Sequence, residues 1–190
     1  MKHILWFILF FIVCIFNFFR EQQYVLIYYT NWTFILETIY FGLCIPKHPK
    51  TSNWARTLWP FIYAPSIVVC IGFWVIVAPI HFTIQKPTNM FLTVVTHGFN
   101  MIAMIMEGNQ IFMKDVWKPV LYTFIYNIFL AIYVGAGGRS ISNHLPYWYA
   151  QYDIALGWIF FALAISAVVI VHFAFSSSKR KTTNSKLYIV

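Results

Sequence analysis

The sequence predicts an all-α, polytopic membrane protein, built as a bundle of six transmembrane helices with both termini in the cytoplasm. Of its 190 residues, 61% are hydrophobic and only 9% are charged, whereas soluble domains carry about 25% charged residues. The apolar residues form continuous runs instead of alternating with polar ones, which favours helices over a β-barrel. The basic residues are also distributed unevenly between the two sides of the predicted bundle, which indicates its orientation.

Six apolar runs approach the length of about 20 residues that a helix needs to cross a bilayer. They occupy residues 3–19, 24–44, 57–81, 89–113, 119–137 and 154–174. Together they predict a single transmembrane domain over residues 1–175. A basic, flexible cytoplasmic tail is expected to follow at residues 176–190.

The basic residues predict the orientation of this domain. With six spans, three of them lie on one side: Arg20, Lys86 and Arg139. Ten lie on the other side: Lys2, Lys47, Lys50, Arg56, Lys114, Lys118, Lys179, Arg180, Lys181 and Lys186. The positive-inside rule therefore places both termini in the cytoplasm. This topology already accounts for the net charge of +8, so no nucleic-acid partner is predicted. Because the predicted helices span the bilayer, membrane lipids are expected to surround the chain.

Two polar residues lie inside separate apolar runs at similar expected depths. Thr30 is about six residues into the second run, or about 9 Å deep at 1.5 Å per residue. His97 is about eight residues into the fourth run, or about 12 Å deep by the same rise. Both runs enter from the non-cytoplasmic side, so the two side chains are expected at one level. An ionisable residue within a membrane span indicates a functional site.

Further polar residues extend this pattern into two layers. On the fourth run, a four-three-four-three spacing places five residues on one helical face: Thr93, His97, Asn100, Met104 and Glu107. The expected outer layer holds Thr30, Asn31, Thr93, His97 and Asn100. The expected inner layer holds Glu37 and Glu107, either protonated because of burial or paired with Lys114 or Arg56.

Metal and redox sites receive little support from the sequence. Cys14, Cys44 and Cys70 all lie in apolar runs, and an odd number of such cysteines provides no disulfide framework. Neither a His-x-x-x-His nor a Cys-x-x-Cys pair occurs, and these are spacings that bind metals. No glycine-rich phosphate loop is present either. The prediction is a protein without a metal or another cofactor.

Several short motifs of the sequence resemble motifs of known membrane proteins. Residues 28–33 (YYTNWT), which run into 39–42 (IYFG), resemble the second-span motif of the androgen-induced and rolling-stone families. Residues 97–100 (HGFN), followed by Met104 and Glu107, resemble their central His-Gly motif. Residues 133–138 and 145–149 (LPYWY) resemble the later extracellular part. The likeness covers most of residues 24–174.

This resemblance implies a function and two catalytic residues. The androgen-induced branch hydrolyses fatty acid esters of hydroxy fatty acids with an intramembrane Thr nucleophile and a His. The motifs place that Thr on Thr30 and that His on His97. The Thr-Asn-Trp and His-Gly-x-Asn sequences are closer to the rolling-stone branch, which is associated with myoblast fusion.

The sequence-based hypothesis is therefore an intramembrane lipid-ester hydrolase. His97 would act as general base for the Thr30 hydroxyl, and the ester would enter sideways from the bilayer. Asn31, Thr93 and Asn100 are candidate donors to the oxyanion.

Two alternatives stay open. One is a non-enzymatic scaffold or cell-fusion factor, whose polar layers fix helix packing. The other is a small transporter that uses Glu37 and Glu107 as proton carriers. The sequence does not distinguish the endoplasmic reticulum from the plasma membrane, and it identifies no protein partner.

Overall fold

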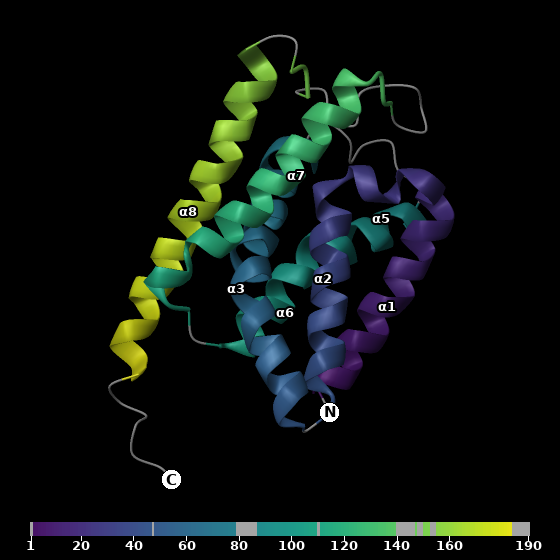
Figure 1. Cartoon of the computed structure of the whole chain (residues 1–190). Helices are drawn as coiled ribbons and strands as arrows, with labels where there is room; N and C mark the ends of the chain where they lie inside the picture. The colour runs from purple at the N-terminus through teal and green to yellow at the C-terminus, as the bar shows by residue number, and fades with distance from the viewer. Residues whose placement is uncertain are drawn as a thin grey trace.

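The helical class predicted from the sequence is confirmed by a computed structural model (Figure 1). The structure describes residues 2–46, 48–78, 87–109, 111–139, 147, 150–152 and 155–183, and within them the regular structure is entirely helical. The elements are α1 Lys2–Glu21, η1 Gln22–Ile27, α2 Tyr29–Cys44, α3 Pro49–Gly72, η2 Phe73–Val77, α5 Pro87–Val94, η4 Val95–Phe99, α6 Asn100–Glu107, η5 Met113–Asp115, α7 Trp117–Gly135 and α8 Ala155–Thr183.

Four helical stretches in the described part of the chain are long and apolar enough to cross a membrane: Lys2–Arg20, Pro49–Ile76, Met113–Gly135 and Ala155–Ser176. The shortest has 19 residues, which corresponds to about 29 Å of helix against a hydrocarbon core of about 30 Å. Large apolar side chains also cover the outside of the molecule, including Leu5, Phe16, Leu163 and Ile170. Such an exterior suits lipid rather than water, so the chain has the character of a membrane protein.

The second predicted run is divided in the structure. The 3-10 helix η1 connects α1 to α2 across one end of the bundle (Figure 1), and α2 begins only at Tyr29. The 16 residues of α2 correspond to about 24 Å of helix, which is shorter than the hydrocarbon core of about 30 Å. The expectation of one helix over 24–44 was therefore wrong in its first five residues, because the chain changes course near Gln22, whose φ is +50°.

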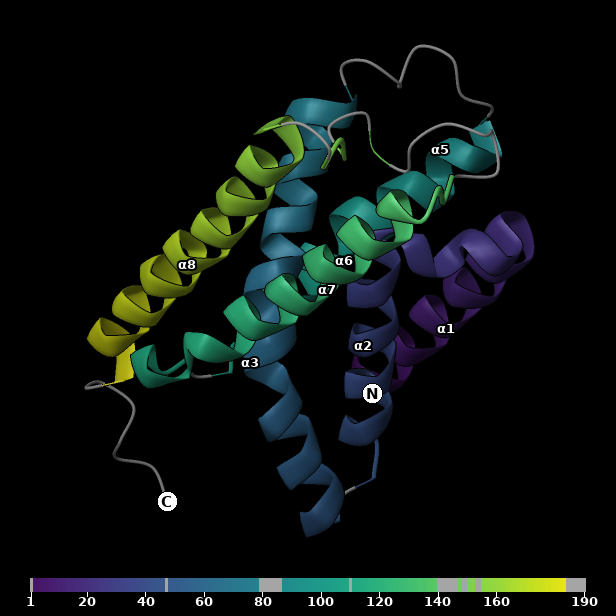
Figure 2. The same cartoon turned by 45° about the horizontal axis from the view of Figure 1, so that its top comes forward.

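The fourth predicted run forms one path from α5 through η4 to α6, oblique to α2 and α3 (Figure 2). Its centre, Val95–Phe99, is π-helical. The path ends at Glu107 instead of residue 113, because Gly108 adopts a left-handed conformation with φ +66°, a common helix terminator. Its apolar part, Phe91–Glu107, is shorter than a typical span.

Two further boundaries differ from expectation. The third predicted run begins earlier, at Pro49, where the His48 side chain accepts a hydrogen bond from the backbone N–H of Lys50; its expected end at residue 81 lies outside the described residues. The last helix continues to Thr183, so the first part of the expected flexible tail is helical. Residues 184–190 lie outside the described part.

The main hydrophobic core joins α1, α2, α3, η4 and α6. Its largest buried members include Phe10, Phe34, Phe41, Trp59 and Met104. A smaller aromatic cluster joins the start of α2 to α7 around Tyr126 and Leu130. The two clusters hold the beginning of α2 between α1 and α7, where Thr30 lies.

Candidate functional site

Thr30 is the second residue of α2 and is half-buried. The helix start has no side-chain cap; instead, the backbone N–H of Tyr29 donates to the Tyr147 hydroxyl at 3.0 Å. Among the described residues, the Thr30 hydroxyl has no hydrogen-bond partner. Because α2 begins at Tyr29, Thr30 lies in the first turn of the helix. A helix that began at residue 24 would have placed it about 9 Å from the helix start. The hydroxyl is thus free to act, but nothing bonded to it activates it as a nucleophile.

His97 lies at the centre of the π-helical segment η4 and is half-buried. Its imidazole stacks on the Phe73 ring, with centroids 3.8 Å apart and planes inclined by 7°. The backbone carbonyl of His97 accepts a hydrogen bond from Trp74 Nε1 at 3.3 Å. The ring atom Nδ1 is buried and has no hydrogen-bond partner within the described chain. Because Phe73 belongs to the second π-helical segment, η2, His97 joins two segments of a kind that is frequent at functional sites.

The structure brings the elements that carry Thr30 and His97 together, because η4 packs directly against both α2 and α3. Both residues belong to the described part of the chain, and no hydrogen bond joins the hydroxyl to the ring. The helices that carry Thr30 and His97 are therefore neighbours, as expected, but the two side chains do not form a hydrogen-bonded dyad.

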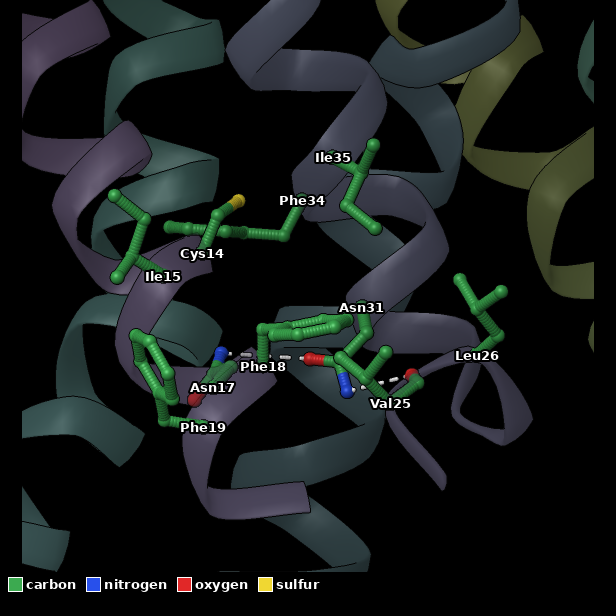
Figure 3. Close-up of a pocket in the computed structure, with 10 residues that line it drawn as sticks. All are labelled: Cys14, Ile15, Asn17, Phe18, Phe19, Val25, Leu26, Asn31, Phe34 and Ile35. Atoms are coloured by element: carbon green, nitrogen blue, oxygen red, sulfur yellow. Dashed lines mark hydrogen bonds between the residues drawn. The ribbon is translucent and has the colours of Figure 1, made fainter. Parts of the chain in front are cut away.

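Asn31 faces α1 and η1. Its Nδ2 donates to the Val25 backbone carbonyl at 2.9 Å, and its Oδ1 accepts from Asn17 Nδ2 at 3.4 Å (Figure 3). Its amide hydrogen bonds are therefore made on the side of α2 that faces α1, which weakens its candidacy as an oxyanion donor. Asn17, on α1, is a polar residue of the site that the sequence analysis missed, although an amide within an apolar run is itself a signal.

Asn100 is the best-placed candidate donor near His97. It follows η4 directly, is fully buried, and its Oδ1 accepts from the backbone N–H of Met101 at 2.7 Å. Its Nδ2 has no partner among the described residues, so one amide donor remains unused. Thr93, also a candidate, is buried near the start of the same path.

Glu37, on α2, has no exposed surface. Its Oε1 accepts a hydrogen bond from Ser66 Oγ, which also bonds to the carbonyl of Ile62. Its Oε2 has no partner in the described chain. Of the two alternatives for Glu37, the pairing with Lys114 or Arg56 is absent among the described residues, and the carboxyl group bonds to Ser66 instead. The apolar run gave no reason to expect Ser66 as the partner.

Glu107 forms a separate group at the other end of the bundle. Its carboxylate lies 3.0 Å from Lys2 Nζ and 2.8 Å from His3 Nε2, and it accepts from the Tyr40 hydroxyl at 3.2 Å. The Tyr40 hydroxyl also accepts from Asn109 Nδ2 at 2.5 Å. The expected partners Lys114 and Arg56 were wrong here too, because the start of α1 packs beside the end of α6.

Phe73 and His3 carried no signal that periodicity could detect. An apolar ring in an apolar run looks like any other lipid-facing or core residue, and His3 lies at the edge of the first run. Their importance depends on which helices become neighbours.

The residues that the structure describes contain no group of three or more His, Cys, Asp or Glu side chains that could hold a metal ion. None of the family models, curated proteins or solved structures compared with the chain matches it.

Proposed function

We propose that this chain crosses the membrane six times, with both termini in the cytoplasm, and hydrolyses lipid esters within the bilayer. Thr30 is the nucleophile of the proposed reaction and His97 is its general base. The observation that carries the proposal is the unpartnered, buried Nδ1 of His97, on a π-helical segment packed against the helix that carries Thr30. An imidazole nitrogen that bonds to no other group is available to accept a proton.

In the proposed first step, Thr30 Oγ attacks the ester carbonyl carbon while a His97 ring nitrogen accepts the hydroxyl proton. The tetrahedral intermediate then collapses, the alcohol leaves with that proton, and an acyl-Thr30 ester remains. Water attacks this ester with His97 again as base, which releases the fatty acid. The step requires the hydroxyl within about 2.6–3.2 Å of the ring nitrogen, or one water away, in the ester complex.

Asn100 provides support for the charged intermediate. Its free, buried Nδ2 offers a hydrogen bond in a dry environment, where such a donor has its largest effect on a developing oxyanion. Asn31 is a weaker candidate because its amide already bonds to Asn17 and to Val25.

The decisive experiment compares Thr30→Ala and His97→Ala with the unchanged protein by fluorophosphonate labelling and by hydrolysis of a fluorogenic long-chain ester. Both variants should lose labelling and hydrolysis. Thr38→Ala is the matched control, because it removes a hydroxyl of the same helix that is already engaged by the Phe34 carbonyl and by Cys14 Sγ, unlike the hydroxyl of Thr30. Equal labelling of all four proteins would rule out Thr30 as the nucleophile.

The six-span topology has its own test. In the six-span topology, α1 and α2 cross the bilayer in opposite directions, and so do α3 and the path that begins with α5. In a cysteine-free background, Gln22→Cys should react with an impermeant maleimide on intact cells, whereas Thr51→Cys should react only after permeabilisation. Likewise, Lys86→Cys should react on intact cells and Lys114→Cys should not. Reaction of Gln22→Cys and Thr51→Cys from the same side would mean that α2 does not cross.

A non-enzymatic scaffold or fusion factor is the second candidate, and one observation favours it. Much of the polar interior is already paired across helices, as in Asn17–Asn31, Ser66–Glu37 and His3–Glu107. Interhelical hydrogen bonds of this kind stabilise membrane bundles by about 0.6 kcal/mol each. A transporter has less support, because Glu37 and Glu107 belong to separate hydrogen-bonded groups.

A further inference from the structure

The first turn of α1 and the last turn of α6 meet at one end of the bundle, and each carries charge that its own helix end disfavours. Glu107 is the last residue of α6, where the helix dipole contributes partial negative charge. Lys2 and His3 begin α1, whose first turn contains no acidic residue, although the dipole contributes partial positive charge there. Each helix end is therefore unfavourable by itself and is stabilised by the opposite charge of the other.

The contacts between these ends are centred on Glu107, whose side chain is only 6% exposed. His3 Nε2 lies 2.8 Å from its Oε1 and 3.2 Å from its Oε2, and Lys2 Nζ lies 3.0 Å from Oε1. The Tyr40 hydroxyl donates to Oε2 at 3.2 Å. These four residues, Lys2, His3, Tyr40 and Glu107, form a clasp between α1, α2 and α6.

Histidine is the residue type of the clasp that changes charge near neutral pH. Its imidazole gains or loses a proton between about pH 5 and pH 8, whereas lysine, glutamate, tyrosine and cysteine side chains keep their charge state between about pH 5.5 and pH 7.5. The groups that face His3 and Glu107 from the neighbouring elements are Lys2 on α1, Tyr40 and Cys44 on α2, the uncharged Trp59 on α3 and the neutral amide of Asn109 after α6.

The charge of His3 decides how strongly the clasp holds. A neutral imidazole donates an ordinary hydrogen bond to the Glu107 carboxylate, whereas a protonated one makes a charge-assisted bond, which is shorter and stronger. Lys2 compensates only weakly, because its side chain is half-exposed and water screens its charge.

We propose that the clasp is a pH-sensitive device: protonation of His3 tightens the attachment of the first turn of α1 to the end of α6, and loss of that proton loosens it. The clasp is therefore strongest at mildly acidic pH and weakens as the pH rises through neutrality. Because α6 continues the helical path that carries His97, the clasp restrains the far end of that path. The clasp itself does not depend on the proposed hydrolysis.

Cys44 provides a native reporter for the clasp. It is the last residue of α2, is half-buried and lies near Lys2 and Tyr40. The start of α1 covers this end of α2 (Figure 1), so closely that a Cβ on Gly42 would lie 3.1 Å from the Phe7 ring. Release of the first turn of α1 should therefore expose the thiol.

The test measures maleimide labelling of Cys44 by peptide mass spectrometry, with the full chain in phosphatidylcholine nanodiscs at about pH 5.5 and about pH 7.5. Each rate is divided by that of glutathione at the same pH, which removes the intrinsic effect of pH on thiol reactivity. In the unchanged protein, the corrected rate should be about fivefold lower at the lower pH, because hydrogen bonds between charged partners are the stronger ones.

Three substitutions and one control complete the design. His3→Gln, which cannot take up a proton, should label at the faster rate at both pH values, and His3→Lys, which stays charged, should label slowly at both. Glu107→Gln should also abolish the difference between the two pH values. His48→Gln is the matched control and should keep the pH response, because the His48 side chain accepts from the nearby backbone N–H of Lys50. A pH response that persists in His3→Gln or Glu107→Gln, or that is absent from the unchanged protein, would overturn the proposal.

Discussion

The imidazole of His97 lies flat on the ring of Phe73, with centroids 3.8 Å apart and an interplanar angle of 7°. Each ring belongs to a π-helical segment, Val95–Phe99 or Phe73–Val77. A π-helical turn accommodates one extra residue and redirects the side chains within it. The stacked pair therefore determines the orientation of the one ring that the proposed chemistry requires.

Phe73→Leu should leave the imidazole of His97 less firmly oriented, while the leucine side chain still fills the space of the Phe73 ring. The loss of the aromatic pair, worth about 0.5–1.5 kcal/mol, should lower the free energy of unfolding by a similar amount. Labelling of Thr30 by a fluorophosphonate should slow by about tenfold if His97 is the base, since general bases contribute at least that much. Phe124→Leu, whose ring meets that of Phe161 edge-on between α7 and α8 and does not contact His97, is the control and should leave the labelling rate unchanged. A normal labelling rate in Phe73→Leu would show that the stacking does not position the base.

Ser66 and Glu37 should behave as a coupled pair. Ser66→Ala removes the hydrogen-bond donor to a buried carboxyl, and an unsatisfied buried group costs about 1–3 kcal/mol. In a Glu37→Leu background the same change should cost much less, because Ser66 then retains only its local bond to Ile62. A double-mutant cycle of unfolding free energies in detergent measures the difference. Additive costs would mean that the two side chains do not interact.

Glu107→Gln should destabilise the end of the bundle where α1, α2 and α6 meet. The amide retains an acceptor for Tyr40 but loses the charge that attracts Lys2 and His3, and hydrogen bonds to charged groups contribute about 1.5–3 kcal/mol. Lys2→Gln should cost less than about 1 kcal/mol, because the Lys2 side chain is half-exposed and exposed ion pairs are weak. Thermal unfolding in detergent compares the two variants, and a larger effect for Lys2 would contradict this ranking.

Tyr147 should make stability depend on alkaline pH. Burial raises the pKa of the Tyr147 phenol to about 12, whereas an unfolded tyrosine titrates near about 10. Between these values the folded chain retains a proton that the unfolded chain has lost. Stability should therefore fall with rising pH by up to about 1.4 kcal/mol per pH unit.

The Tyr147→Phe variant provides the control for this pH effect. It also removes the acceptor for the Tyr29 backbone N–H at the start of α2, so at pH 8 it should be less stable by about 0.5–1.5 kcal/mol. Its unfolding free energy should fall less steeply between pH 10 and pH 12. Parallel pH curves for the two proteins would show that Tyr147 does not hold its proton in the folded state.

Composition and local pattern were sufficient to predict several features of this protein. The helical class and the helices α1, α7 and α8 follow from long apolar runs, because helix formation and partition into lipid depend on residues that are close in sequence. Glu37 in the run over 24–44 and His97 in the run over 89–113 could be recognised as costly, because lipid penalises polar side chains.

Only the tertiary structure determined which side chains meet. Glu107 pairs with His3 across 104 residues, His97 stacks on Phe73, and Asn17 contacts Asn31 around the turn at η1. Periodicity specifies which face of a helix is polar, but it does not specify which helix that face contacts. The tertiary structure also placed Thr30 in the first turn of α2. The chain turns near Gln22 and forms the 3-10 helix η1 before α2 begins, although the apolar sequence of that segment predicts a continuous helix.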